Sequence, residues 1–431
     1  MKFYSLNNKA ADVSFKDAVL RGIAPDRGLY FPREIKPLPA SFFENIEKLS
    51  DHEIAFKAIA QFASDSIPEN KLKEIITSVL DFPFPVVELE KNVATLELFH
   101  GPTLAFKDVG ARFMAQSLGY FSEGKSSEVT VLVATSGDTG GAVANGFLGV
   151  KGVNVVILYP SGKVSDIQER QLTTLGQNIT ALEVNGNFDD CQNMVKTAFL
   201  DSELKSEIQL TSANSINVAR WLPQMFYFLF SYKKLKSKNQ PIVFSVPSGN
   251  FGNICAGMVA QKLGMPVAHF IAATNVNDTV PRFMRTQEYT PVTSKATISN
   301  AMDVGDPSNF IRIRKLYKNN FAELRNNLSS YSFTDEQTKR AILEIYNTCN
   351  YIADPHGAVG YLGLKEYQKD NPDTFGVFLE TAHPVKFLDV VEKTLKLNLP
   401  IPSQIQNVLE KNKVSVNIDA YDELKSYLLG K

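Results

Sequence analysis

The sequence predicts an α/β fold with a doubly wound, mostly parallel sheet. From about residue 90 onward, short apolar runs alternate with stretches that have the helical spacing of apolar residues. The apolar runs lack an alternation of polar and apolar residues, which is typical of strands buried by helices on both faces. Glycine-rich turns follow two of these runs and precede helical stretches. These three observations favour a sheet whose strands are joined by helical crossovers.

Residues 1–85 have a different pattern and are predicted to form a small, mainly helical N-terminal domain. Ser14 is the expected cap of a helix over residues 14–20, and apolar residues between Ile54 and Phe62 recur at helical spacing. Pro83 and Pro85 mark the expected boundary. Residues 86–431 then form the second region.

The second region contains candidate strands rich in Val, Ile and Phe. They are Val129–Ala134, Val153–Tyr159, Ile179–Val184, Pro241–Val246, Val267–Ala273 and Phe375–Leu379. The candidate helices are Gly140–Leu148, Ser165–Leu175, Asp189–Leu200, Asn217–Leu235 and Gly252–Leu263. Between Asn277 and about Ser332, Pro, Asn and Ser are scattered without a period, so we expect this stretch to be irregular.

The composition is that of an ordinary globular protein. The 431 residues are 44% hydrophobic, and 45 basic against 46 acidic residues leave a formal charge of -1, which favours neither nucleic acid nor a membrane surface as a partner. The first residues lack a leader-like apolar run, and no window approaches the roughly 20 apolar residues of a membrane span. We therefore expect a cytoplasmic protein, with monomer and homodimer both left open.

Cysteines and histidines are few and widely spaced. The three cysteines have no CxxC spacing, which is typical of reduced thiols in a core. The five histidines include no HxxH or HxxxH pair, so no metal site is expected.

One lysine has unusual neighbours. Lys107 follows Leu-Ala-Phe in the turn-prone segment His100–Asp108, and these neighbours prefer burial. A desolvated lysine loses affinity for its proton and becomes a nucleophilic amine, the state required for a Schiff base with a carbonyl compound. A structural lysine at the start of a helix, with its ammonium reaching solvent, is the alternative interpretation.

Two loops have the geometry of anion-binding turns. Residues 135–141 and residues 248–253 each follow a candidate strand and precede a candidate helix, where backbone N–H groups are free. Their glycines allow close approach of a ligand, and Ser136 and Thr139 add hydroxyl donors. A single such loop could use glycine for steric reasons alone, but two in one sheet beside a reactive lysine indicate two anion sites.

A third glycine segment is expected to be unrelated to phosphate binding. Residues 119–126 fit the GxxxxGK[ST] spacing of a P-loop, but they follow a helical stretch and precede a strand. A phosphate-binding P-loop requires the opposite order of elements. Neither of the other two loops is a GxGxxG fingerprint, which argues against a dinucleotide.

A Schiff-base lysine with one loop for a cofactor phosphate and one for a substrate anion describes a pyridoxal-phosphate site. The segments His100–Asp108, Thr135–Gly141, Ser248–Asn253 and Glu380–Pro384 resemble the threonine synthases, a family of fold-type II (tryptophan synthase β-like) enzymes. The resemblance covers nearly the whole chain, and the residues Ala273–Phe283 are similar to the longer bacterial and fungal branch. It implies a catalytic region with a larger and a smaller α/β lobe.

The resemblance also implies roles for individual residues. Lys107 would bind pyridoxal phosphate as a Schiff base, and Thr381 would lie near the pyridine nitrogen. Asp138 stands where the family often has an asparagine that contacts the phenolic oxygen of the cofactor. The residues implied to surround the cofactor phosphate are Gly249, Asn250, Phe251, Gly252 and Asn253.

The implied substrate is O-phospho-L-homoserine, which carries a carboxylate and a phosphate. Asn214 and Arg220 match the phosphate-binding segment of the family, and a guanidinium suits phosphate geometry. Ser136 and Thr139 would help to hold the substrate. The implied reaction releases phosphate from Cγ and adds water at Cβ to give L-threonine, with Lys107 as the mobile base.

Other functions remain open at this stage. A hydroxyamino-acid dehydratase or a cysteine synthase would have the same fold, but neither needs a second anion site. A non-catalytic α/β ligand-binding protein would keep the loops without the chemistry. Asp108 is expected to cap a helix or to orient the lysine, and His356 and His383 are expected to cap helices or to pack in the core.

Overall fold

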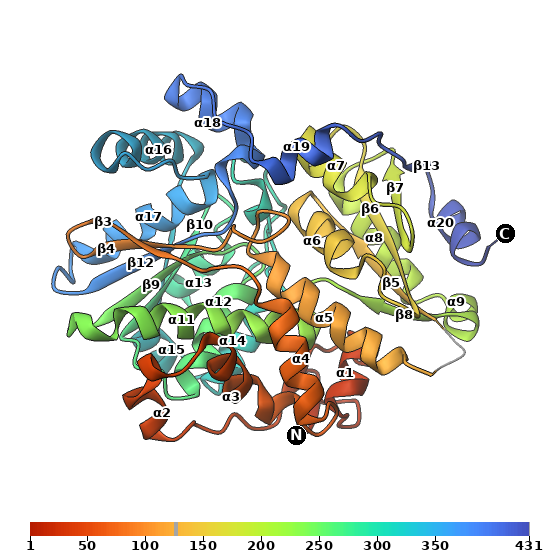
Figure 1. The fold of residues 1–431 in the computed structure, drawn as a ribbon, viewed down its shortest axis with the longest axis horizontal. Helices are drawn as coiled ribbons and strands as arrows, with labels where there is room; N and C mark the ends of the chain where they lie inside the picture. Colours follow the sequence, from red (N-terminus) through yellow and green to blue (C-terminus); the bar gives the residue numbers. More distant parts are fainter. Residues whose placement is uncertain (125–127, 431) are drawn as a thin grey trace.

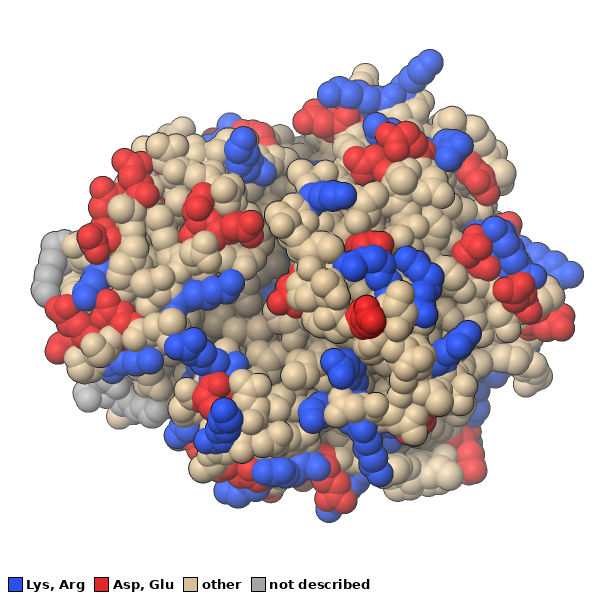
Figure 2. Space-filling view, turned by 180° about the vertical axis from the view of Figure 1, so that it is seen from behind, with Lys and Arg blue, Asp and Glu red and all other residues tan. Residues whose placement is uncertain are grey.

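A computed structural model describes residues 1–124 and 128–430. Two mostly parallel sheets lie side by side, each with helices on its faces, and the N-terminal helices pack below and between them (Figure 1). This arrangement confirms the predicted α/β class and its mostly parallel pairing. The space-filling view in Figure 2 shows basic and acidic side chains interspersed over one face, as expected from the balanced composition.

The larger sheet has the strand order β11-β10-β9-β12-β4-β3, and its neighbours are parallel except for β3 with β4. Its strands are β3 (Val86–Glu90), β4 (Val93–Glu97), β9 (Ile242–Pro247), β10 (His269–Thr274), β11 (Leu328–Ser332) and β12 (Phe375–Glu380). Every residue of β9, β10 and β12 is buried, because helices cover both faces. The helices associated with this sheet are α11 (Met225–Leu235), α12 (Gly252–Lys262), α13 (Thr279–Thr286), α14 (Phe310–Leu316), α15 (Phe321–Asn327), α16 (Asp335–Cys349), α17 (Pro355–Gln368) and α18 (Leu388–Leu395).

The second sheet is parallel throughout, in the order β13-β7-β6-β5-β8. Its strands are β5 (Val129–Ala134), β6 (Val153–Pro160), β7 (Ile179–Val184), β8 (Gln209–Ser212) and β13 (Val416–Ile418). After β12 the chain crosses from the larger sheet to this one, where β13 pairs with β7 (Figure 1). The helices on this side are α5 (Lys107–Ser122), α6 (Asp138–Phe147), α7 (Asp166–Thr173), α8 (Phe188–Ala198), α9 (Ser202–Glu207), α19 (Ser403–Leu409) and α20 (Tyr421–Leu428).

The N-terminal residues form helices around a short antiparallel pair, β1 with β2. These elements are β1 (Phe3–Ser5), α1 (Phe15–Arg21), β2 (Tyr30–Pro32), α2 (Ala40–Glu44), η1 (Ile46–Lys48), α3 (Asp51–Ala63) and α4 (Glu69–Val79). Ser14 caps α1 by accepting from Asp17 N, as predicted. One hydrophobic cluster runs from Phe3 into the core of both sheets, so these helices are packed onto the rest of the molecule.

Most predicted elements are confirmed with small differences at their ends. The candidate strands are β5, β6, β7, β9, β10 and β12. The predicted helix Asn217–Leu235 is divided into α10 (Val218–Trp221), η2 (Leu222–Gln224) and α11, because Pro223 has no N–H to donate to a continuous helix.

The prediction of an irregular stretch between Asn277 and Ser332 is wrong in part. This stretch contains α13, η4 (Asn300–Met302), α14, α15 and the strand β11. Each helix is short and buries only a few residues, so its period is difficult to read from the sequence. β11 has one fully buried residue among polar ones, since it lies at the edge of the larger sheet.

The segment with P-loop spacing, residues 119–126, begins in the last turn of α5 and comes before β5 in the chain, so a helix precedes it and a strand follows it, as the sequence indicates. Its Lys125 and Ser126 lie outside the described residues. Among residues 1–124 and 128–430, no helix is long and apolar enough to cross a membrane. No group of three or more His, Cys, Asp or Glu within the same residues is placed to hold a metal ion.

Candidate active site

Lys107 is the first residue of α5, and the loop before it lies against the segment that follows β12. Ala105 and Ala382 form an isolated antiparallel bridge. Phe106 N donates to the Thr381 carbonyl oxygen at 2.9 Å. Two of the predicted motifs, far apart in the sequence, are therefore hydrogen-bonded to each other.

Asp108 closes the lysine loop from within. Its buried carboxylate accepts from Thr103 N at 3.0 Å and from the Thr103 hydroxyl. Burial raises the pKa of Asp108 to about 6. Because both contacts lie within the loop, Asp108 shapes the turn that presents Lys107, which agrees with its expected orienting role.

The turn after β9 presents unused backbone donors. None of the backbone N–H groups of residues 249–253 donates a hydrogen bond within the described part of the chain. Phe251 has a φ of 61°, a left-handed conformation that turns successive N–H groups to one side. An added Cβ at Gly249 would lie 2.7 Å from the Ala301 carbonyl oxygen, so this position requires glycine. The turn fits an anion such as a phosphate.

Two side chains of this turn are already engaged. Asn250 donates from Nδ2 to Ser215 Oγ at 2.9 Å and accepts from Ser308 N at 2.6 Å. The Phe251 ring packs edge-on against Phe310 at 5.7 Å. Of these two residues, only the backbone N–H groups therefore remain free to bind a ligand.

The turn after β5 is tightened by Thr135. Its Oγ1 accepts from Gly137 N at 3.0 Å and from Gly140 N at 2.8 Å. Gly137 has a φ of 139°, which other residues rarely adopt, and α6 begins directly after it. The hydroxyl groups of Ser136 and Thr139 belong to half-buried residues and are available to a ligand at this turn.

Residues 214–220 link both turns to the lysine. Asn214 Nδ2 lies 3.4 Å from the carbonyl oxygen that ends β5, and Ser215 Oγ accepts from Asn250 in the other turn. Arg220 Nη1 donates to the Lys107 carbonyl oxygen at 3.2 Å. The structure thus brings the predicted lysine, both turns and the predicted phosphate segment into one site.

Arg220 is a buried cation with unused donor capacity. Its side chain is 3% exposed, and within the described residues its Nε has no hydrogen-bond partner. Burial lowers the pKa of Arg220 to about 10, so the guanidinium remains charged near neutral pH. No carboxylate of the described residues is within ion-pair distance of Arg220, and a buried cation without such a partner is costly unless an anion binds beside it.

Lys107 has the depressed proton affinity that its neighbours in the sequence predict. Burial lowers the pKa of Lys107 to about 8. Asp138 opposes this change, whereas Lys386 and Arg220 add to it because they are also positive. A substantial fraction of the amine is therefore neutral slightly above physiological pH, as a nucleophile or base requires.

Lys386, which no sequence motif marked as a site residue, is paired with Asp138. Lys386 Nζ lies 2.7 Å from Asp138 Oδ1, and both side chains are buried. Gln168 Nε2 donates to the same carboxylate oxygen at 2.9 Å. Burial acts to raise the pKa of Asp138, but Lys386 and Lys107 hold it well below its usual range. Asp138 is therefore an ionised partner of lysine rather than a stand-in for asparagine.

Arg312 is a second residue that was not predicted, and it lies in the stretch expected to be irregular. Arg312 donates to the carbonyl oxygens of Ser215 at 3.0 Å, Ile216 at 2.6 Å and Tyr30 at 3.0 Å. These bonds fix the start of the 214–220 segment. No local pattern marks this arginine, because its acceptors are backbone groups distant in the sequence.

Thr381 and the two histidines lie at the ends of elements. Thr381 is 6% exposed at the end of β12. His383 Nδ1 accepts from Val385 N at 3.1 Å and caps η5 (Pro384–Phe387). His356 Nδ1 lies 2.6 Å from Asp354 Oδ1. The capping interpretation is confirmed for His383, and His356 has a structural carboxylate partner.

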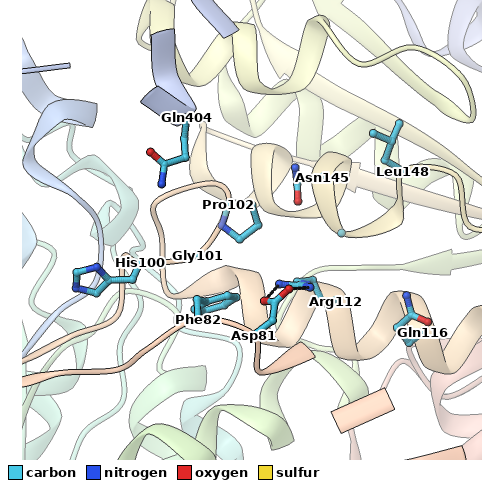
Figure 3. A pocket seen from close by; sticks show the side chains of 11 residues that line it. Asp81, Phe82, His100, Gly101, Pro102, Arg112, Gln116, Asn145, Leu148 and Gln404 are labelled. Atoms are coloured by element: carbon cyan, nitrogen blue, oxygen red, sulfur yellow. Dashed lines mark hydrogen bonds and ion pairs between the residues drawn. The ribbon is translucent and has the colours of Figure 1, made fainter. Parts of the chain in front are cut away.

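A cavity of about 460 Å³ lies beside the lysine loop (Figure 3). Its lining includes His100 and Pro102 from the loop and Arg112 from α5, which is paired with Asp81. Lys107 and the two glycine turns do not line it. This cavity is thus separate from the cluster of lysine, arginine and turns.

Three family models match successive parts of the chain. They describe a threonine synthase N terminus over residues 2–79, a pyridoxal-phosphate-dependent enzyme over residues 77–376 and a threonine synthase C-terminal region over residues 357–428. The chain belongs to the threonine synthase family. It is a pyridoxal-phosphate-dependent enzyme of fold type II. The nucleophilic lysine and the free N–H groups of residues 249–253 fit this cofactor.

Similar proteins match over their whole length. The threonine synthase of Buchnera aphidicola subsp. Baizongia pistaciae is 44% identical over 434 residues, covering 100% of both chains. The crystal structure of threonine synthase from Escherichia coli has a TM-score of 0.93 at 42% identity, covering 100% of both chains. A structure of pyridoxal-phosphate-bound threonine synthase from Brucella melitensis has a TM-score of 0.92 at 32% identity, covering 99% of this chain and 98% of that one.

Proposed function

We propose that the protein converts O-phospho-L-homoserine and water into L-threonine and phosphate, the last step of threonine biosynthesis. Family membership supports the reaction class, and the chemistry of the site supports the substrate. The observation that carries the proposal is the direct contact between Arg220 and the backbone of Lys107. A substrate whose amino group reaches Lys107 would thereby place a second anion beside a buried guanidinium.

We assign the cofactor to Lys107 and the turn after β9. Lys107 Nζ would form the covalent bond to the carbonyl carbon of pyridoxal phosphate. The N–H groups of Gly249, Asn250, Phe251, Gly252 and Asn253 would bind its phosphate. Thr381 follows β12 beside the lysine loop, where its hydroxyl would serve the pyridine nitrogen without carrying a charge.

We assign the two substrate anions to different groups. Arg220 and Asn214 would bind the phosphate, because a guanidinium supplies paired charge-assisted hydrogen bonds. Ser136 and Thr139 would bind the carboxylate, together with free N–H groups of the turn after β5. This division uses the charged donor for the more highly charged group.

The catalytic work of the chain is mainly proton transfer. Pyridoxal phosphate, when bound, supplies an electron sink for charge that develops at Cα of the substrate. Lys107 would take the proton from Cα and pass it to the bound cofactor, because its amine holds only one extra proton at a time. It would then take a proton from Cβ as phosphate leaves Cγ, and return that proton to Cγ. Water adds its hydroxide at Cβ and gives its remaining proton to the released phosphate, and the proton taken first returns to Cα. Arg220 stabilises the departing phosphate, and Asp108 holds the loop from which Lys107 reaches these carbons.

The domain division, the compartment and the exclusion of related enzymes are assigned as follows. We propose that residues 1–85 form the N-terminal domain and residues 86–431 the catalytic region, a division that the family-model boundaries support. We propose the cytoplasm as the compartment, because all three cysteines are free thiols, as is usual in reducing surroundings. The buried, partly unpaired Arg220 disfavours a dehydratase or cysteine synthase, whose substrates need no second anion site.

Changing Lys107→Ala tests the proposal. We expect release of phosphate from O-phospho-L-homoserine to fall by about 10³-fold or more, with loss of the visible absorbance of bound cofactor. The exposed Lys163 gives a matched control, since Lys163→Ala should retain both. Threonine formed by the wild-type protein identifies the product. Near-normal turnover by Lys107→Ala, or consumption of serine or threonine in preference to phosphohomoserine, would contradict the assignment.

A further inference from the structure

The carboxylate of Asp138 is poorly suited to the phenolic oxygen of the cofactor. A carboxylate can only accept hydrogen bonds, and an ionised phenolic oxygen is also an acceptor. Asp138 Oδ1 already accepts from Lys386 at 2.7 Å and from Gln168 at 2.9 Å. Asparagine at this position could donate an N–H, whereas aspartate cannot. A different donor is therefore needed in this chain.

Lys386 has a donor to spare. An ammonium group carries three N–H donors. Lys386 directs one to Asp138 Oδ1 and one to the Thr103 carbonyl oxygen at 2.9 Å. No third acceptor is found among residues 1–124 and 128–430, and Lys386 is only 1% exposed. A buried charged donor without an acceptor costs free energy, so we expect an acceptor on a bound ligand to take the third N–H.

The position of Lys386 also suits a contact with the cofactor. Thr103 belongs to the loop that ends at Lys107, so Lys386 is hydrogen-bonded to the segment that presents the reactive amine. Lys386 and Asp138 both act on the charge of Lys107 through space, in opposite directions. The ion pair therefore lies beside the amine to which the cofactor is attached.

We propose that Lys386 donates its third N–H to the phenolic oxygen of bound pyridoxal phosphate, and that Asp138 holds Lys386 in place instead of contacting the cofactor. The inference rests on the proposed attachment of the cofactor to Lys107. It makes Lys386 a cofactor-binding residue. The pair supplies a donor at the position where an asparagine amide would otherwise donate.

The test compares pyridoxal phosphate with its deoxy analogue that lacks the phenolic oxygen. Binding of each compound to the apoenzyme is measured by absorbance titration, without substrate. The wild-type protein should prefer pyridoxal phosphate by ~10–100-fold, the range expected for a hydrogen bond between charged groups. Lys386→Met should lose this preference, while Lys386→Arg should keep much of it because the cation remains.

Two outcomes would overturn the inference. One is that Lys386→Met weakens binding of both compounds equally, as a purely structural lysine would. The other is that it weakens neither. If the single variant does not fold, the double variant Asp138→Ala/Lys386→Met removes both charges together. If the double variant still prefers pyridoxal phosphate over the deoxy analogue, the inference is also overturned.

The titration is independent of the proposed reaction. If wild-type protein shows the preference and Lys386→Met loses it, the contact stands even if phosphohomoserine is not the substrate. If the protein releases phosphate from phosphohomoserine while wild type and Lys386→Met discriminate alike, only the contact is wrong.

Discussion

The turn after β5 and the turn after β9 both join a buried parallel strand to a helix, but their surroundings differ. Residues 249–253 offer free N–H groups and are held by neutral partners, with Asn250 bound to Ser215. The turn after β5 instead contains Asp138, which is buried and paired with Lys386. The turn after β9 can bind an anion with backbone dipoles alone, whereas the turn after β5 contains one member of an ion pair that lies close to Lys107.

The difference shows how one local design serves two purposes. Backbone dipoles fix a phosphate without altering the protonation of nearby side chains. A charged pair near Lys107 changes its affinity for a proton, and each member of the pair acts with the opposite sign. The turn after β9 therefore acts through backbone dipoles alone, whereas the turn after β5 also contributes to the charge around Lys107.

For the comparison of the two turns, the largest expected effect comes from Arg220, at the end of the segment 214–220 that contacts both of them. Arg220→Met should lower kcat/KM for phosphohomoserine by ~10²–10³-fold, because a charged donor to the leaving phosphate is lost. The kcat/KM of Arg220→Lys should lie between those of Arg220→Met and wild type, because lysine keeps the positive charge but not the paired N–H donors of a guanidinium. Steady-state kinetics, with and without inorganic phosphate as an inhibitor, measure the effect in both variants. Unchanged inhibition by phosphate in Arg220→Met would place the phosphate elsewhere.

Arg312 is the matched control for that prediction. It is also buried, but it donates to several backbone carbonyl groups. Arg312→Met should therefore lower the melting temperature, whereas Arg220→Met should change inhibition by phosphate with little effect on melting. The comparison separates a structural arginine from one that serves a ligand.

An intermediate effect is expected from placing charge in the neutral turn. Asn250→Asp should weaken binding of pyridoxal phosphate by ~10–100-fold, because a carboxylate would then lie beside its phosphate. Absorbance titration of the apoenzyme gives the affinity. The same substitution at the exposed Asn319 controls for a general change of charge. Equal affinity in Asn250→Asp would mean that the cofactor phosphate is bound outside residues 249–253.

The smallest effect concerns the pH dependence of cofactor attachment. Only a neutral amine attacks a carbonyl, and the pKa of Lys107 is lowered from 10.5 to about 8. The rate at which the apoenzyme combines with pyridoxal phosphate should thus rise about fivefold between about pH 7 and about pH 8, then level off. Stopped-flow absorbance measures the rate, with Lys107→Ala to subtract reaction at surface lysines. A rate that continues to rise toward pH 10 would indicate an ordinary, solvated lysine.

The sequence predicted the parts of the fold and site that depend on local pattern. Strands with runs of Val and Ile were found, as were the two turns and Lys107, because each has a short signature. β8, with the sequence Gln-Leu-Thr-Ser, was missed since its residues are mostly polar. β4 was missed although it lies inside the larger sheet, because it is short and follows a turn close to the expected domain boundary.

The parts that could not be predicted depend on contacts between distant segments. Lys386 resembles a surface lysine in its local sequence, and only folding places it beside Asp138. Arg312 likewise acquires its role from carbonyl groups of Tyr30, Ser215 and Ile216. Both are buried cations that donate to acceptors distant in the sequence, and no spacing rule identifies those acceptors.

The strand order of the two sheets has a mechanical consequence. In the described part of the chain, the path passes between the sheets three times: from β4 to β5, from β8 to β9 and from β12 to β13. Lys107, Arg220 and Lys386 each lie on one of these passages. A rotation of one sheet relative to the other would displace all three cations together. Such a rotation would change the spacing of the positive charges, and with it the affinity of the molecule for negatively charged ligands.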